Sequence, residues 1–189
     1  MGNIIRNTAG FAVSIVSQYV QEGDTVVDAT CGNGHDTLAL AQMVGAEGKV
    51  YGFDISGIAV MNTMKLLEDN DVQAEIELIY DGHEDMDMFI ETEVSAIVFN
   101  LGYLPGEDKD ETTKTETTMT ALEKAIGMIK VDGVVSAVLY PGHDEGRRER
   151  DAVLSWAAEL DKGKYHSAHI KMVNQLETAP EILLVTRKK

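Results

Sequence analysis

The sequence has one cysteine, Cys31, and no long apolar run among its 189 residues. A single cysteine excludes a disulfide within the chain and favours a reducing compartment. The apolar stretches are of strand length, well short of the roughly 18–20 residues of a membrane helix. A basic end, an apolar run and a small-residue cleavage site do not occur together as in a signal peptide. We therefore expect a cytoplasmic protein that does not use a membrane.

Basic residues are also scarce: 16 Lys and Arg stand against 32 Asp and Glu, a formal net charge of -16. This balance argues against a protein that coats nucleic acid through its overall charge. The deficit is local, because residues 68–123 hold 17 acidic and 2 basic residues, whereas residues 124–189 hold 9 acidic and 11 basic. The last third can therefore contact a polyanion through a small local surface.

Short apolar segments alternate with amphipathic segments of helical spacing along the chain. This alternation predicts one α/β domain over residues 1–189: a mostly parallel, doubly wound, seven-stranded sheet with helices on both faces and an antiparallel C-terminal hairpin. The strands are expected at 25–29, 49–54, 76–80, 94–100, 134–140, 165–173 and 181–187, and the helices at 7–21, from 37, from an N-cap at Ser56 to 68, at 113–129 and at 147–160.

Polar residues end four of the expected strands: Asp28, Asp54, Asp81 and Asn100. Ligands of open α/β sheets bind at the carboxyl ends of the strands. After the first strand comes a turn from Thr30 to Asp36, in which Gly32 and Gly34 allow the backbone to approach a ligand. We therefore expect the site at this edge.

The first turn has the wrong chemistry for a pyrophosphate. Thr37 replaces the third glycine of the dinucleotide fingerprint, and the turn has no lysine for a phosphate-binding loop. Its carboxylates, Asp28 and Asp36, suit a cation such as a sulfonium. Asp54 is placed for two ribose hydroxyls, and Asp81-Gly82-His83 for an adenine. The sequence thus resembles class I S-adenosylmethionine-dependent methyltransferases. The alternative in this fold, a nicotinamide-binding domain, is disfavoured by Thr37 and the acidic turn.

The fourth strand ends in Asn100-Leu-Gly-Tyr103, which resembles the Asn-Pro-Pro-Tyr of amine-methylating members with its middle pair changed. There the asparagine accepts the amine hydrogens and the aromatic ring packs on the acceptor group. Methylation of a pyrimidine carbon through a cysteine nucleophile is disfavoured, because Cys31 lies in the cofactor turn and reads as a small buried side chain.

Three longer motifs are typical of one family: Asp28-Ala-Thr-Cys-Gly-Asn-Gly-His-Asp-Thr37, Asn100-Leu-Gly-Tyr-Leu-Pro-Gly-Glu-Asp-Lys109 and Tyr140-Pro-Gly-His-Asp-Glu-Gly146. They resemble the bacterial family long labelled rRNA methylases, whose members methylate the aminomethyl group of 5-(aminomethyl)-2-thiouridine at the tRNA wobble position. Glu107 departs from the glycine expected in many members.

The resemblance implies specific contacts. Added to the turn and strand-end residues, it gives the cofactor-binding set Asp28, Gly32, Asn33, Gly34, Asp36, Asp54, Ser56, Gly82 and His83. It places Asn100, Tyr103 and Lys109 at the methyl acceptor, as the catalytic set. The substrate-binding candidates are His143, Arg147, Arg148 and Asn174, with the tRNA anticodon region as the expected partner.

Other classes stay open at this stage. A small-molecule or rRNA methyltransferase has the same cofactor site, and a non-catalytic nucleoside-binding module has the same fold. A homodimer is compatible with the length of the chain, because a small methyltransferase can need a second subunit to bind RNA. No metal site is expected: His166 and His169, three apart on a strand, face opposite sides.

Overall fold

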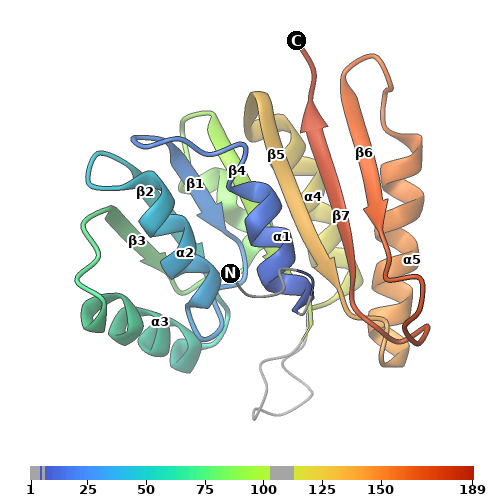
Figure 1. The fold of residues 1–189 in the computed structure, drawn as a ribbon, viewed down its shortest axis with the longest axis horizontal. Helices are drawn as coiled ribbons and strands as arrows, with labels where there is room; N and C mark the ends of the chain where they lie inside the picture. Colours follow the sequence, from blue (N-terminus) through green and yellow to red (C-terminus); the bar gives the residue numbers. More distant parts are fainter. Residues whose placement is uncertain (1–4, 6, 103–112) are drawn as a thin grey trace.

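A seven-stranded sheet lies between two layers of helices in the computed structural model, which describes residues 5, 7–102 and 113–189 (Figure 1). The strands are β1 (Thr25–Asp28), β2 (Lys49–Phe53), β3 (Glu75–Ile79), β4 (Val94–Asn100), β5 (Ile129–Leu139), β6 (Tyr165–Ile170) and β7 (Glu181–Arg187). The helices are α1 (Thr8–Val16), α2 (His35–Val44), α3 (Gly57–Asp69), the 3₁₀ helix η2 (His83–Met88), α4 (Thr115–Met128) and α5 (Asp144–Glu159).

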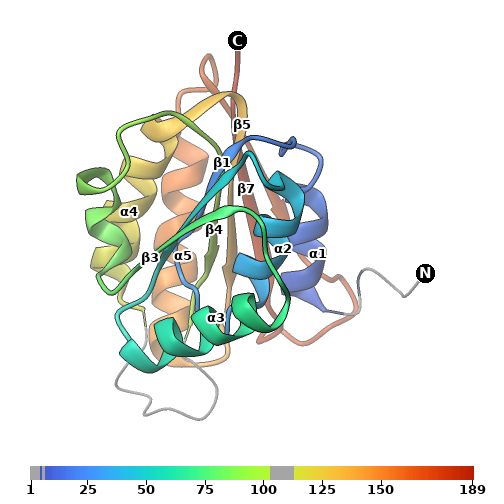
Figure 2. The same cartoon turned by 90° about the vertical axis from the view of Figure 1, so that its left-hand side faces the viewer.

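The helices cover both faces of the sheet (Figure 2). Helices α1, α2 and α3 pack on one face, and η2, α4 and α5 on the other. Strand β4 serves both cores, since Ala96 and Val98 point to the α1–α2 side whereas Ile97 and Phe99 point to the α4–α5 side. Successive strand residues face opposite ways, so a strand covered on both faces is apolar throughout.

The strand order is β3-β2-β1-β4-β5-β7-β6. Strand β7 runs antiparallel to β5 and to β6, and the other neighbouring strands are parallel. This confirms the doubly wound sheet with its C-terminal hairpin. The winding reverses between β1 and β4, and such switch points are where ligands bind in this class of fold. Asp28 and Asn100, at the ends of these two strands, are therefore neighbours.

The helix α4 and the strand β5 meet without a loop, contrary to the expected gap before residue 134. Ile129 caps the helix with an extended backbone and begins the strand. Asp132 has a φ of 63°, and the β4–β5 register shifts between Val94 and Ala96. The Asp132-Gly133 pair thus makes a bulged start to β5 rather than a turn that precedes it.

Two helix ends differ from expectation for local reasons. Helix α1 ends at Val16 rather than at residue 21, because Gln18 and Tyr19 donate to carbonyls three residues back in a tightening last turn. Helix α5 begins at Asp144 rather than Arg147, because the His143 Nδ1 accepts from the Gly146 N–H at 3.0 Å and caps it. In the part of the chain that the structure describes, no helix is both long and apolar enough to cross a membrane.

Candidate functional site

The turn between β1 and α2 is a tight backbone cradle. Gly32 and Gly34 have φ of 53° and 80°, a region that favours glycine. A Cβ on Gly34 would lie 2.8 Å from the Thr63 Cα, so only glycine lets the start of α2 approach α3 this closely. The Thr63 hydroxyl donates to the Gly32 carbonyl at 3.2 Å. Two helices therefore fix the path of this turn.

Asp54, after β2, is held by the backbone on two sides. Its Oδ2 accepts from the Gly32 N–H at 2.8 Å, and its Oδ1 accepts from the Ser56 N–H at 2.9 Å. A carboxylate has about four acceptor positions, so further hydrogen bonds to hydroxyls are open to it. Ser56 caps α3, as expected, with its hydroxyl accepting from the Ala59 N–H. The turn and the β2 end are thus joined through one carboxylate.

Asp28 lies beneath the turn, fully buried. Its two oxygens accept from the Thr30 N–H at 3.1 Å and from the Thr37 hydroxyl at 2.6 Å. Burial, together with the charge of the nearby Asp36, raises the pKa of Asp28 to about 7. The structure therefore places Asp28 as the support of the turn, behind the surface that Gly32 and Asp36 present.

The raised pKa of Asp28 makes a stability prediction. The folded state binds the Asp28 proton more tightly than the unfolded state does. The contribution of Asp28 to stability therefore falls as the pH rises from the ordinary carboxyl pKa of 3.8 to the raised pKa of about 7. Asp28→Asn removes the charge, and its amide can still accept from Thr30 and donate to Thr37. We expect the variant to match or exceed the parent in unfolding free energy at pH 8, with a flatter slope between pH 4 and 7.

Denaturant unfolding at pH 5 and pH 8 measures this effect, with the exposed Asp69→Asn as a matched control that keeps the parent's slope. If Asp28→Asn lowers the unfolding free energy relative to the parent by the same amount at pH 8 as at pH 5, the Asp28 charge has no role in the pH dependence.

At the switch point, Asn100 is fixed by three neighbours. Its backbone N–H donates to the Thr30 hydroxyl at 2.7 Å, and its Nδ2 donates to the Asp36 Oδ2 at 3.4 Å. A further side-chain hydrogen bond joins it to Tyr140. Its buried Oδ1 has no partner among the described residues. The structure thus brings Asn100 and Asp36 together and leaves an amide oxygen available to a donor such as an amine.

Tyr140 is a residue that the sequence reasoning left out of the site. It follows β5 directly, and its ring lies 3.5 Å from where a Cβ on Gly102 would be. Burial raises the pKa of the Tyr140 phenol and that of the Asp36 carboxyl. The signal was present: the strand-end rule that selected Asn100 applies equally to the neighbouring strand β5.

His83 lies at the third strand end, in the buried position that opens η2. Burial lowers the pKa of its imidazole and so favours the neutral ring. The ring Nδ1 lies 3.2 Å from the Ala29 carbonyl oxygen and therefore carries the proton, since a carbonyl only accepts. Among the described residues, the buried Nε2 has no partner, which leaves one acceptor nitrogen.

The remaining cofactor candidates flank these residues. Gly82 links Asp81, whose Oδ1 accepts from the Gly82 N–H at 2.8 Å, to η2. The exposed Asn33, in the first turn, accepts from Asn62 at 3.3 Å. The predicted cofactor residues thus lie on the first turn and on the segments that follow β2 and β3, along the edge where ligands of this fold bind.

The arginines at the start of α5 have acidic partners. Arg147 bonds Asp144, and Arg148 lies 3.7 Å from Glu145. Exposed pairs of this kind contribute about 0–1 kcal/mol, so a phosphate can replace the carboxylate. Asn174 lies in the exposed segment between β6 and β7, at the same edge of the sheet. Tyr103 and Lys109 lie outside the described residues.

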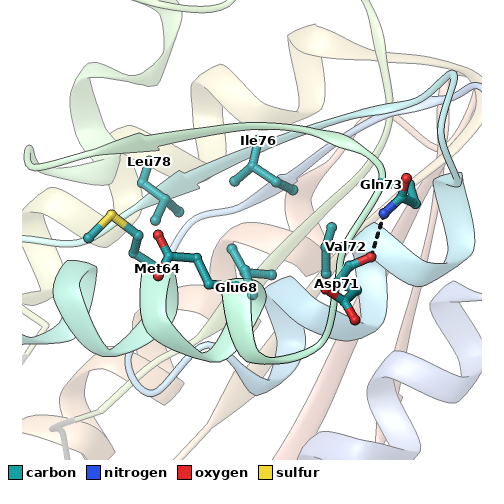
Figure 3. A pocket seen from close by; sticks show the side chains of 8 residues that line it. Met64, Glu68, Asp71, Val72, Gln73, Ile76 and Leu78 are labelled. Atoms are coloured by element: carbon teal, nitrogen blue, oxygen red, sulfur yellow. Dashed lines mark hydrogen bonds between the residues drawn. The ribbon is translucent and has the colours of Figure 1, made fainter.

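The structure also has a hollow of about 560 Å³ between α3 and the edge strand β3, lined by apolar side chains such as Val72, Ile76 and Leu78 (Figure 3). None of the predicted site residues lines it. Within the described segments, no group of three or more His, Cys, Asp or Glu could hold a metal ion. The predicted residues Asp36, Asp54 and Asn100 lie instead around the switch point, at the edge of the sheet where the strands end.

The residues there fit a nucleoside that carries a positive charge. The glycine cradle admits a ligand close to backbone, Asp54 offers oxygens for hydroxyls, and the His83 Nε2 offers an acceptor. Asp36 and Asp54 supply negative charge next to the cradle, and opposite charges attract strongly at partly buried sites.

Comparison with known proteins places the chain in a family. Residues 50–186 match the family described as "Putative rRNA methylase". The chain is 36% identical over 182 residues to the chloroplastic tRNA (mnm(5)s(2)U34)-methyltransferase of Arabidopsis thaliana, covering 91% of this chain and 66% of that protein.

Two solved structures of 29% identity or more match this chain over nearly their whole length. A crystal structure of a "putative rRNA-methylase" from Clostridium thermocellum has a TM-score of 0.93 at 41% identity, covering 97% of this chain and 98% of that one. A "putative methyltransferase" from Streptococcus mutans, solved in complex with SAH, has a TM-score of 0.87 at 29% identity, covering 97% and 99%.

The fold and the switch-point site thus define a methyltransferase of the Rossmann-like class. The chain belongs to the rRNA methylase family that its residues 50–186 match.

Proposed function

We propose that this chain is an S-adenosylmethionine-dependent N-methyltransferase that acts on the aminomethyl group of 5-(aminomethyl)-2-thiouridine at the tRNA wobble position. The observation that carries the proposal is the Asn100 amide, whose buried Oδ1 lacks a partner among the described residues while its Nδ2 bonds Asp36. An amide oxygen beside a carboxylate binds an amine or ammonium by complementary donors and charge.

The cofactor, when bound, supplies an electrophilic methyl group on a sulfonium. The chain's own residues position it: Asp54 takes the ribose hydroxyls, the Gly32–Gly34 turn admits the methionine part, and Ser56, Gly82 and His83 flank the adenine. Orientation of this kind supplies much of the acceleration of a transfer that needs in-line geometry. We assign Tyr103 to the face of the acceptor group and Lys109 to its vicinity.

The RNA is held by a small contact in this proposal. Arg147, Arg148 and Asn174 lie at the edge of the sheet that also carries the cofactor turn, and His143 keeps the start of α5 in place through its cap on Gly146. The overall charge of -16 opposes non-specific RNA binding. Specificity therefore rests on entry of the modified base into the site. We further propose a cytoplasmic location, and a homodimer that adds RNA contacts from a second copy.

The name of the Arabidopsis relative supports the tRNA substrate, and the acidic charge supports the alternative, a small-molecule methyltransferase. The two are separated by incubating the protein and labelled S-adenosylmethionine with tRNA that carries the aminomethyl uridine. The matched control is the same tRNA without the aminomethyl group, and a second arm offers rRNA. We expect label only in the aminomethyl tRNA. Label in rRNA, or only in a small-molecule extract, would assign the other substrate class.

A further inference from the structure

We propose that Asp36 is the group that takes the proton from the substrate amine, with the hydrogen bond from the Asn100 Nδ2 holding it in place. This inference rests on the proposed function, because it specifies how that acceptor is activated. A primary alkylamine has a pKa of about 10, so near neutral pH it arrives as an ammonium without a free lone pair. An N-methyltransferase must therefore remove a proton before the nitrogen can react.

Within the described part of the chain, Asp36 is the carboxylate that hydrogen-bonds the Asn100 side chain. Its Oδ2 lies 3.4 Å from the Asn100 Nδ2, and the Asn100 Oδ1 has no partner among the described residues. An ammonium that donates one hydrogen to the Asn100 Oδ1 is thereby within reach of the Asp36 carboxylate. Asp28, buried behind the turn, already accepts from Thr30 and Thr37, and is therefore not available for this role.

The surroundings of Asp36 suit a base. Burial raises the pKa of Asp36, while the neighbouring His35 and the hydrogen bond from Asn100 act in the opposite direction. Two other titratable groups interact with it. The charge of Asp36 raises the pKa of Asp28, and burial together with the Asp36 charge raises the pKa of the Tyr140 phenol and keeps it neutral. A carboxylate destabilised by partial desolvation is a better proton acceptor than one in water.

The steps balance in atoms and charge. The ammonium gives one proton to Asp36, which becomes a neutral carboxylic acid, and the nitrogen recovers its lone pair. That pair forms the new nitrogen–carbon bond as the methyl carbon separates from sulfur, which keeps the electrons of the broken bond. The product leaves as a secondary ammonium, and Asp36 then returns its proton to solvent.

Asp36→Asn keeps the size of the side chain and removes the base. The parent needs an ionised Asp36 and an ammonium. Its rate of methyl transfer is therefore independent of pH between the pKa of Asp36 and the pKa of the substrate amine. In Asp36→Asn the amine must arrive neutral, so we expect a loss of about 100-fold or more at pH 7, recovering about tenfold per pH unit toward the amine pKa near 10. Asp36→Glu, which keeps a carboxylate, is expected to retain the flat profile at a lower rate.

A binding measurement without turnover gives an independent readout. In the complex with S-adenosylhomocysteine, the parent is expected to bind an aminomethyl anticodon stem-loop at least about tenfold more tightly than the same RNA without the amine, the effect of one ammonium–carboxylate hydrogen bond. Asp36→Asn should lose this preference when both RNAs are compared at saturating S-adenosylhomocysteine, so that a change in cofactor affinity does not affect the comparison. The exposed Asp69→Asn should behave as the parent does.

The outcomes separate this inference from the proposed function. A parent that does not methylate the aminomethyl RNA overturns the proposed function. A parent that does so, with an Asp36→Asn variant that shows the same pH profile, overturns only the role of Asp36. Loss of S-adenosylhomocysteine binding in Asp36→Asn, with RNA preference retained, would make Asp36 a cofactor contact instead. If Asp36→Asn does not fold, Asp36→Glu decides: a profile that rises with pH contradicts the inference.

Discussion

Asp54→Ala is expected to weaken the binding of S-adenosylhomocysteine by at least about 100-fold. The Asp54 carboxylate accepts from the Gly32 and Ser56 amides, so alanine leaves two backbone donors without partners and releases the turn that forms the cradle. It also removes the proposed acceptor of the ribose hydroxyls. An unmade hydrogen bond in a buried site costs about 1–3 kcal/mol, and two or more together exceed about 100-fold in affinity.

Isothermal titration calorimetry with S-adenosylhomocysteine measures this effect directly. Glu75→Ala is the matched control, since Glu75 is an exposed carboxylate at the amino end of β3, at the opposite end of the sheet. Asp54→Asn adds a second test: an amide can accept from one backbone N–H but presents its own NH₂ to the other, so we expect a comparable loss. Unchanged affinity in both variants would move the cofactor away from the β2 end.

Asn100→Ala is expected to slow methyl transfer and to leave the binding of S-adenosylhomocysteine nearly unchanged. S-adenosylhomocysteine should bind within about twofold of the parent, because the Asn100 side chain faces Asp36 and Tyr140 rather than Asp54. The rate of methyl transfer should fall by about 100- to 1,000-fold, the range found when one preorganised hydrogen-bonding group is removed from a reacting centre. The loss should appear in kcat, since the Asn100 oxygen orients the amine in the transition state.

Single-turnover transfer to aminomethyl RNA, read alongside calorimetry, separates the two effects. Asn70→Ala serves as the control, because it removes an exposed amide at the end of α3, and it should match the parent in both measurements. An Asn100→Ala variant with the parent's rate would place the acceptor elsewhere, and one that loses S-adenosylhomocysteine affinity would place Asn100 in the cofactor site.

The sequence predicted the sheet well because strand and helix signals agreed with each other. The β4 segment from Val94 to Phe99 is apolar because both of its faces are covered, and the Ser56 cap marks the start of α3. The expected helix boundaries near residues 113 and 147 were wrong by a few residues. The His143 imidazole caps the start of α5 through one hydrogen bond that spacing alone does not reveal, whereas α4 begins after Lys114, which makes no side-chain cap.

Within the site, the sequence identified which residues gather at the edge but not what each one faces. Asp28 and Asp36 were treated alike as acidic residues of one turn. The structure separates them, because the Thr37 hydroxyl turns Asp28 inward while Asn100 keeps Asp36 at the switch point. Tyr140 was missed since its partner, Asn100, lies on another strand, and contacts across strands depend on sheet order rather than on spacing in the chain.

The central claim, methylation of an amine on the wobble uridine, is tested most directly by mass spectrometry of nucleosides from tRNA before and after reaction with S-adenosylmethionine. The account predicts that 5-(aminomethyl)-2-thiouridine disappears and that an equal amount of its N-methyl derivative, heavier by one methylene, takes its place. A methyl group found on any other nucleoside, with the aminomethyl uridine left unchanged, would contradict it.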